Sequence, residues 1–379
     1  MTNSPGKETW LYVIRSFFGI KGHNPPHKTR SYFKNIFSFT NIFVHISFLY
    51  SGSLLLFTSG NFALKRSVTD LSCLILPVVI FHLIRMQSGK MCVFYMYLKN
   101  VLPKFTKFSC REKRIINATV LVTFLFPATV ALAMIAALIS NYSKPYIRFW
   151  LFGHDLAERQ IAETLLCFIC MMVYFFAKFL VPSLATLVYG IITYKFSQAI
   201  HIQNEVMKKN VFSKTFSFQV KVYYRLLEGC RLFEDCSKAT MLFLILCYCN
   251  TFYTGIGIAL REQTSTPNVA IYTESVFTLI PCIFIIVILL IIASRITAKT
   301  SETRLTFQQL YRNNIVDGGS ISTQQIKLIK VLMQQEPFYL TAWDFFRVDK
   351  GLILSLFGTV LTFCILIMQL KKVDLDSLK

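Results

Sequence analysis

The sequence predicts an all-α membrane protein in which seven helices cross the bilayer. Hydrophobic residues make up 54% of the 379 residues and charged residues only 16%, a balance more apolar than that of soluble domains. The apolar residues gather into runs of about twenty, the length that a helix needs to cross the hydrocarbon. Basic residues lie between the runs, so the net charge of +21 indicates membrane topology rather than nucleic-acid binding.

Each apolar run contains at most one or two strongly polar side chains, and no segment remains for a soluble domain. A single transmembrane domain is therefore expected to cover residues 1–379. The spans are predicted, in chain order, at about 37–59, 69–87, 117–140, 165–192, 239–260, 274–295 and 351–370.

The distribution of Lys and Arg predicts how the spans are oriented. Thirty of these residues precede the first span or lie in the second, fourth and sixth connections, whereas nine lie on the opposite side. Because basic residues mark the cytoplasmic side, we expect a cytoplasmic N-terminus and an extracellular C-terminus. Asn141 begins an Asn-Tyr-Ser glycosylation sequence in a connection that this topology places outside.

Two cytoplasmic connections, at about 193–238 and 296–350, are long and show helical periodicity. Leu226 and Phe233 lie on an apolar stripe in the first connection, and Leu332 lies on another in the second. An amphipathic helix needs a surface against which to bury its apolar face. We therefore expect these connections to form a packed helical anchor beneath the membrane.

Lys178 is the one Lys or Arg expected deep within a span, close to the middle of the fourth span and near Tyr174. An unpaired Lys at this depth costs about 3 kcal/mol even on lenient scales, so its ammonium should face protein or water. Two roles stay open: contact with a ligand or cavity, and a structural contact with backbone carbonyls or buried water.

The fifth span carries a polar stripe in its outer half. Such a stripe can line a ligand pocket, or it can form hydrogen bonds with neighbouring helices, and both interpretations stay open. Together with Tyr174 and Lys178, the candidate pocket residues are Asn250, Thr251, Tyr253 and Thr254.

No combination of residues indicates an enzyme, a bound metal or a cofactor. Most of the eleven Cys lie in apolar runs or in the expected cytoplasmic connections, where disulfides rarely persist. Cys167 and Cys170 have CxxC spacing, but they lie inside an apolar run without the second ligand pair or strand–helix context of such motifs. No catalytic residues are predicted.

The last span combines small and polar residues on one face with bulky apolar residues elsewhere. The stripe recurs at three-, four- and seven-residue steps and consists of Gly351, Ser355, Gly358, Thr362 and Gln369. Close packing between helices in lipid explains such a stripe, and so does the lining of a water-filled path. Gln369 favours the path, because an amide near the outer end forms a polar ring in a symmetric oligomer.

The segment from Leu340 to Leu370 resembles the insect gustatory receptor signature. It reads TAWDFFRVD at 341–349 and TFCILIMQL at 362–370. In that family a Thr-Ala, Phe-Phe and Val/Leu-Asp stretch precedes a last span reading Thr-Tyr, five hydrophobic residues and Gln-Phe. Phe363 and Leu370 depart from the usual Tyr and Phe. Both remain bulky and apolar, but Phe363 loses the hydroxyl and any hydrogen bond that it makes.

The resemblance implies a tastant-gated, non-selective cation channel in the plasma membrane of chemosensory neurons. It implies a tetramer lined by the last span, with Thr362 on the path and the outer constriction at Gln369 and Leu370. The implied partners are a small-molecule tastant bound in the outer half of the helices, membrane lipid, and further gustatory receptor subunits in a homo- or heterotetramer. The expected contacts between subunits include Thr341, Ala342, Phe345, Phe346 and Asp349.

Three other classes of protein compete with this interpretation. An insect odorant receptor is the nearest alternative, although the motif in the last span favours the gustatory branch. A G-protein-coupled receptor has an external N-terminus, which the basic residues oppose. A secondary transporter commonly has broken helices in two matching halves, and the sequence shows no such symmetry.

Overall fold

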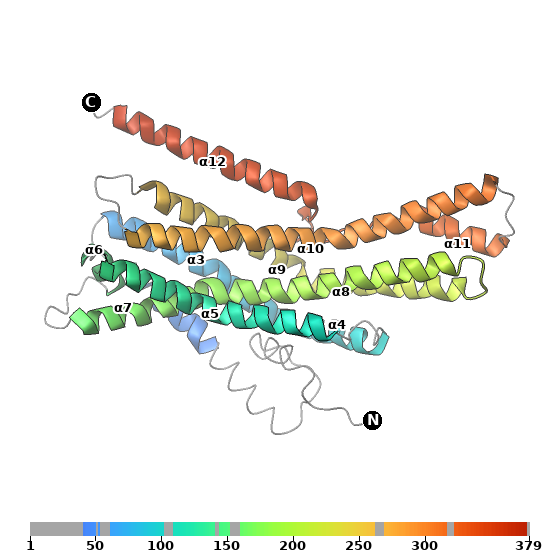
Figure 1. The fold of residues 1–379 in the computed structure, drawn as a ribbon, viewed down its shortest axis with the longest axis horizontal. Coiled ribbons are helices and arrows are strands. Elements are labelled where there is room, and N and C mark those ends of the chain that lie inside the picture. The colour runs from blue at the N-terminus through green and yellow to red at the C-terminus, as the bar shows by residue number, and fades with distance from the viewer. Residues whose placement is uncertain are drawn as a thin grey trace, which may run out of the picture.

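The computed structural model describes residues 41–50, 52–53, 61–101, 109–140, 144–151, 160–261, 269–316 and 322–376. Nearly all of them are helical, which confirms the predicted all-α fold class. Long helices run side by side in an elongated bundle (Figure 1). The elements are α3 (Asn61–Met86), α4 (Ser88–Val101), α5 (Cys110–Ser140), α6 (Lys144–Trp150), α7 (Gln160–Phe175), the π-helical turn η1 (Phe176–Leu180), α8 (Val181–Lys209), α9 (Phe216–Arg261), α10 (Val269–Val316), α11 (Thr323–Gln334), β1 (Thr341–Ala342), β2 (Phe346–Arg347) and α12 (Lys350–Asp376).

Four described helical stretches are long and apolar enough to cross a membrane. They are Cys110–Ser140, Ile161–Lys209, Phe216–Ile258 and Val269–Asn313. A fifth candidate is the pair Leu71–Met86 and Ser88–Leu98, which is bent by 55°. Two shorter apolar helices, Asn41–Tyr50 and Lys350–Val360, overlap the expected first and last spans. The expected first span lies only partly within the described residues.

Helices α8, α9 and α10 run without interruption from the apolar spans into the expected anchor region. Helix α9 has 46 residues and α10 has 48. The ends of α8, α9 and α10 extend together with α11 beyond the rest of the bundle (Figure 1). Phe216, Phe233 and Phe307 are fully buried in their shared core, and Leu332 of α11 is 1% exposed. The amphipathic faces of this region therefore pack against one another.

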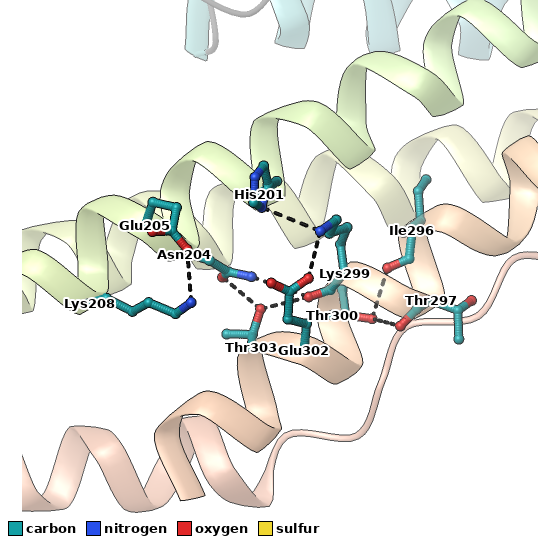
Figure 2. Close-up of polar contacts among 10 residues, drawn as sticks. All are labelled: His201, Asn204, Glu205, Lys208, Ile296, Thr297, Lys299, Thr300, Glu302 and Thr303. Carbon is teal, nitrogen blue, oxygen red and sulfur yellow. Dashed lines mark hydrogen bonds and ion pairs between the residues drawn. The ribbon is translucent and has the colours of Figure 1, made fainter. Parts of the chain in front are cut away.

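Polar side chains join α8 to α10 in this extended region (Figure 2). The buried Asn204 amide accepts a hydrogen bond of 2.6 Å from the Thr303 hydroxyl and donates to the Lys299 carbonyl at 3.3 Å. Lys299 also lies 2.6 Å from the Glu302 carboxylate. These contacts satisfy polar groups between two helices that are otherwise joined by apolar packing.

Two helices begin with reciprocal capping contacts that the sequence encodes. At α5 the Ser109 hydroxyl accepts from the Glu112 backbone N–H at 3.2 Å, and the Glu112 carboxylate accepts from the Ser109 N–H at 2.7 Å. At α11 Ser322 and Gln325 form the same arrangement. Each pair satisfies backbone donors that the first helical turn leaves unpaired.

Candidate ligand cavity and pore helix

A cavity of about 920 Å³ lies between α5, η1, α8, α9 and α10. This volume is within the range of small-molecule sites. Its walls are largely aliphatic and aromatic, with a few polar side chains among them. From the sequence-predicted pocket, Lys178 and Thr251 line this cavity.

The turn that carries Lys178 is π-helical, and Pro182 explains why. Proline has no backbone N–H, so the carbonyl of Lys178 lacks the donor that an α-helix supplies four residues later. The chain widens into η1 (Phe176–Leu180) just before this position. Such single π turns often mark functional sites, and this one places Lys178 on the cavity wall.

Hydroxyl groups form the other polar part of the wall. The hydroxyls of Thr186 on α8 and Tyr248 on α9 lie 2.8 Å apart. The Thr251 hydroxyl donates to the backbone carbonyl of Cys247 at 2.7 Å. All four residues line the cavity, so a buried polar patch faces the aliphatic walls of α5 and α10.

A short β-hairpin, formed by β1 and β2, connects the anchor region to α12. Thr341 pairs with Arg347 and Ala342 with Phe346. Trp343 and Asp344 in the turn have φ values of 51° and 60°, in the left-handed region that such side chains rarely adopt. The conformation therefore requires support from outside the hairpin.

Helix α9 supplies this support. The Glu234 carboxylate accepts from the Thr341 hydroxyl at 2.6 Å and from its backbone N–H at 3.1 Å. Lys238 donates to Asp344 at 2.7 Å, and its carbonyl accepts from the Trp343 N–H at 3.1 Å. The hydrogen bond from Lys238 lowers the pKa of Asp344. The signature segment is thus held by the part of α9 that belongs to the expected anchor region, just before the fifth expected span.

Helix α12 leaves the hairpin and diverges from the bundle (Figure 1). Asp349 begins it, because its carboxylate accepts from the Leu352 N–H at 3.1 Å. Leu352, Ile353 and Leu356 are half-buried against the anchor core. The opposite face is exposed and carries the small and polar stripe of Gly351, Ser355, Gly358, Thr362 and Gln369.

Comparison with known proteins adds to this geometry. The sequence profile described as 7tm chemosensory receptor matches residues 97–374. This chain belongs to the 7tm chemosensory receptor family. No protein of curated function matches it in sequence.

The receptor also shares its fold with solved structures of an insect olfactory receptor, OR5 from Machilis hrabei. The complex of OR5 with eugenol superposes with a TM-score of 0.66 at 13% identity, covering 96% of this chain and 97% of that one. A second OR5 structure gives a TM-score of 0.63 at 13% identity, covering 96% and 98%. At 13% identity these matches show a shared fold, and they do not separate taste from odorant subtypes.

The remaining predicted pocket residues of the receptor lie outside the cavity lining. Tyr174 is buried beneath Lys178, whose Nζ lies 5.3 Å from the ring centroid. Asn250 donates to Ser72 at 3.4 Å, and Thr254 accepts from the Cys73 thiol at 3.3 Å. Two residues of the polar stripe on α9 therefore contact α3, as expected if the stripe joins neighbouring helices.

Tyr253 contacts helix α12 of the receptor instead. Its ring lies 4.6 Å from that of Phe363, edge to face. The gustatory receptor signature has Tyr at the position of Phe363. Phe363 lacks the Tyr hydroxyl and makes an aromatic contact with Tyr253 of α9. Sequence periodicity gives no sign of this pairing.

The cavity of the receptor reaches further inward than the expected outer-half pocket. Glu112, Tyr194 and Arg295 line it at the anchor end of their helices. The Glu112 carboxylate pairs there with Lys195, at 2.9 Å from each oxygen. Charged side chains therefore lie at both ends of the cavity, with Glu112 and Arg295 at the anchor end and Lys178 deeper in the expected span.

The five expected subunit contacts of the receptor have different surroundings. Ala342 is fully buried, Phe346 packs against the anchor core, and Thr341 and Asp349 are bonded as described above. Phe345 is 76% exposed and faces outward from the single chain. Sequence reasoning missed Glu234 and Lys238, the α9 residues that hold the hairpin.

The expected pore residues of the receptor lie on α12. Thr362 is exposed and donates to the Gly358 carbonyl at 2.9 Å, and Gln369 is exposed. Leu370 lies in the helix, but its side chain is outside the described part. Asn141, the expected glycosylation position, also lies outside the described residues.

One group of potential metal ligands in the receptor was not apparent from the sequence. His201, Glu205 and Glu302 each place a ligand atom within 4.8 Å of the others (Figure 2). Lysines bind both carboxylates, with Lys208 2.8 Å from Glu205 and Lys299 2.6 Å from Glu302. The spacing of His201 and Glu205 is a signal for one side of this group, whereas Glu302 is remote in sequence.

Proposed function

We propose that this receptor is a gustatory receptor, a subunit of a tastant-gated, non-selective cation channel in the plasma membrane of chemosensory neurons. Its N-terminus is cytoplasmic and its C-terminus extracellular. Four subunits, identical or from related receptors, meet through α12 and the outward-facing Phe345. The hairpin residues Thr341, Ala342, Phe346 and Asp349 hold α12 in position for these contacts.

The exposed stripe on α12 is the observation that supports the channel. A helix in lipid that presents Gly358, Thr362 and Gln369 away from its own bundle needs a partner surface or water. A ring of such helices around an axis provides both. Gln369 and Leu370 form the narrow outer part of the path, and an apolar ring there opens by widening.

The cavity supplies the ligand site that such a channel requires. A tastant bound beside Lys178 and Thr251 favours the open state to the extent that it binds that state more tightly. Asn250 and Thr254, through their contacts with α3, and Tyr253, through Phe363, connect the neighbourhood of the site to other helices.

Replacing Gln369 with Ala tests the pore. We expect the Gln369→Ala receptor to reach the cell surface normally and to show altered unitary conductance or cation selectivity in patch recordings. Gln334→Ala is the matched control, because Gln334 is an exposed amide at the end of α11. Equal currents in Gln369→Ala and the unmodified receptor would remove Gln369 from the pore.

An odorant receptor is the second candidate, favoured by the likeness to OR5, which binds eugenol in its solved complex. The two functions differ in the ligands that evoke current. Recordings with volatile aromatics and with water-soluble tastants, applied to the same cells, separate them.

A further inference from the structure

We propose that the cavity selects ligands with an apolar body and one carboxylate, and that Lys178 binds the carboxylate. The inference rests on the proposed function only for the claim that such a ligand opens a channel. The binding itself is a property of the cavity and can be measured without current.

The Lys178 ammonium has no hydrogen-bond acceptor among the described residues. Its side chain is 2% exposed and lines the cavity. A buried charge is stable only where it is paired or solvated, and inside a membrane span this requirement is stricter. The site therefore lacks an acceptor, and the cavity is the space in which one can be placed.

Aromatic rings stabilise the charge in part. The Nζ atom lies 5.3 Å from the Tyr174 ring centroid and 5.5 Å from that of Phe179. Cation–π contacts use none of the directional N–H donors of the amine. These donors have no acceptor among the described residues and are therefore available for a ligand.

No carboxylate of the protein reaches Lys178 within the described lining. Glu112 is the only acidic residue among the lining side chains that the structure describes, and it is paired with Lys195. Phe126 on α5 contacts Phe179, so the level of Lys178 is about 14 residues from Glu112, or roughly 21 Å along the helix. Among the described residues that line the cavity, none supplies a negative charge at the level of Lys178.

The remaining walls define the rest of the ligand. The Thr251 hydroxyl hydrogen is used by the Cys247 carbonyl, and Thr186 and Tyr248 are bonded to each other. Most other lining side chains are aliphatic or aromatic. A polyol such as a sugar would leave many hydroxyls unpaired here, whereas an alkyl or aromatic acid satisfies both the apolar walls and Lys178.

Two sources can supply such an acid. It can be an external tastant, or a free fatty acid dissolved in the bilayer. Val122 on α5 and Ile288 on α10 both line the cavity and are 62% and 51% exposed, so the cavity borders the surface that faces lipid. Both sources share the same chemistry, and the experiment distinguishes them.

The probes are laurate, methyl laurate and dodecanol, added to purified receptor in detergent. Ligand binding to the folded state raises the melting temperature. We expect laurate to bind at least about ten-fold more tightly than the ester or the alcohol, because only laurate forms a charge-assisted hydrogen bond with Lys178. Equal affinities for the three probes overturn the inference without any variant.

The variants isolate the amine. Lys178→Met keeps an unbranched apolar side chain and should lose the preference for laurate over its ester, whereas Lys178→Arg should retain it. Lys330→Met is the matched control, because Lys330 also lies over a ring, that of Tyr311 at 5.6 Å, but is exposed on α11. Wild-type laurate affinity in Lys178→Met overturns the role of Lys178, and loss of the preference in Lys330→Met overturns its specificity. If Lys178→Met does not fold, two other measurements test the inference: the preference of Lys178→Arg for laurate over its ester, and the affinities of the three probes for the wild-type receptor.

Two further readouts separate sources and claims. A carboxylic acid that copurifies with the receptor and is released on denaturation supports the bilayer source, and current evoked by external laurate supports the tastant source. Tight binding of laurate without any current contradicts the proposed channel and supports this inference. Current evoked by neutral tastants, together with no binding preference for laurate, supports the proposed channel and contradicts this inference.

Discussion

The Thr341 hydroxyl shows how much of the signature segment depends on one side-chain contact. It lies 2.6 Å from the Glu234 carboxylate and 3.1 Å from that of Asp344, so one group joins α9, β1 and the hairpin turn. Trp343 and Asp344 keep left-handed conformations beside it. Without these bonds the hairpin would lose contacts that hold its unfavourable turn.

Replacing Thr341 with Val removes the hydroxyl while keeping the shape of the side chain. We expect Thr341→Val to destabilise the receptor by about 1 to 2 kcal/mol, because a half-buried carboxylate loses a strong donor. The measurement is the melting temperature in detergent, followed by fluorescence-detected size-exclusion chromatography. Thr341→Ser retains the hydroxyl and should melt near wild type. Identical melting of the Val and Ser variants would show that the bond to Glu234 contributes nothing.

For single residues, the sequence indicated that Lys178 is unusual but did not indicate which helices the polar side chains of the fifth span contact. Lys178 was conspicuous because a Lys inside an apolar run needs an explanation in any fold, and it does line the cavity. Asn250 and Tyr253 are candidate pocket residues because they belong to a polar stripe in the outer half of the fifth span, where the resemblance implies a ligand, and helix–helix contacts are the open alternative. Periodicity gives the face of a helix but not the helix opposite, and here these residues contact α3 and α12.

Among the elements, α9 and α10 approach each other closely at Gly255 of α9. A Cβ at Gly255 would lie 2.8 Å from two carbon atoms of Leu279, whereas a Cβ at Gly257 would meet nothing within 4 Å. The two positions lie in the same helix and differ only in the face on which they lie. They form a natural matched pair.

We expect Gly255→Ala to destabilise the receptor by about 1 to 3 kcal/mol, because Leu279 must move in a packed contact. Gly257→Ala should be neutral or stabilising by up to about 1 kcal/mol, since Ala favours the helix. Melting temperatures of the two variants, measured together, provide the test. A Gly255→Ala receptor as stable as Gly257→Ala would mean that Leu279 repacks without cost.

The elements themselves were predictable where apolar runs are long. Their ends were not, because α8, α9 and α10 continue through the change from apolar to amphipathic sequence without a residue that stops a helix. The break that does occur, at η1, follows from Pro182, which removes one donor and widens a turn without ending the helix. A hydropathy run locates a membrane span, whereas the backbone N–H groups available for hydrogen bonding determine where an α-helix widens into a π-helical turn.

For the whole molecule, the predicted orientation is the property on which the proposed function depends. We expect an epitope tag placed after Lys379 to be stained on intact cells and a tag before Met1 to be stained only after permeabilisation. The physical reason is the excess of basic residues on one side of the spans. The reverse staining pattern would contradict the channel and favour a G-protein-coupled receptor.

The fold class and the family were within reach of the sequence, and the assembly was not. Apolar runs specify membrane helices, and the signature around Leu340–Leu370 led to a chemosensory receptor family, which the family profile over residues 97–374 confirms. A single chain presents the stripe on α12 to no partner, so the choice between helix packing and pore lining depends on surfaces of other copies. No reading of one chain contains that information.

Because α10 is long, a small tilt near the cavity displaces its far end by several ångströms. Pro281 lines the cavity and lies inside this helix, where a missing N–H makes bending easier. About 35 residues follow it, or roughly 50 Å of rigid rod, so a tilt of about 5° at the cavity would displace the far end by roughly 4 Å. Midway along this rod, the Thr300 hydroxyl accepts the backbone N–H of Phe338 at 3.0 Å, two residues before the segment that leads into the hairpin. Under the proposed function, a tilt of α10 beside the cavity would move Thr300 and, through its bond to Phe338, the segment that leads into the hairpin and α12.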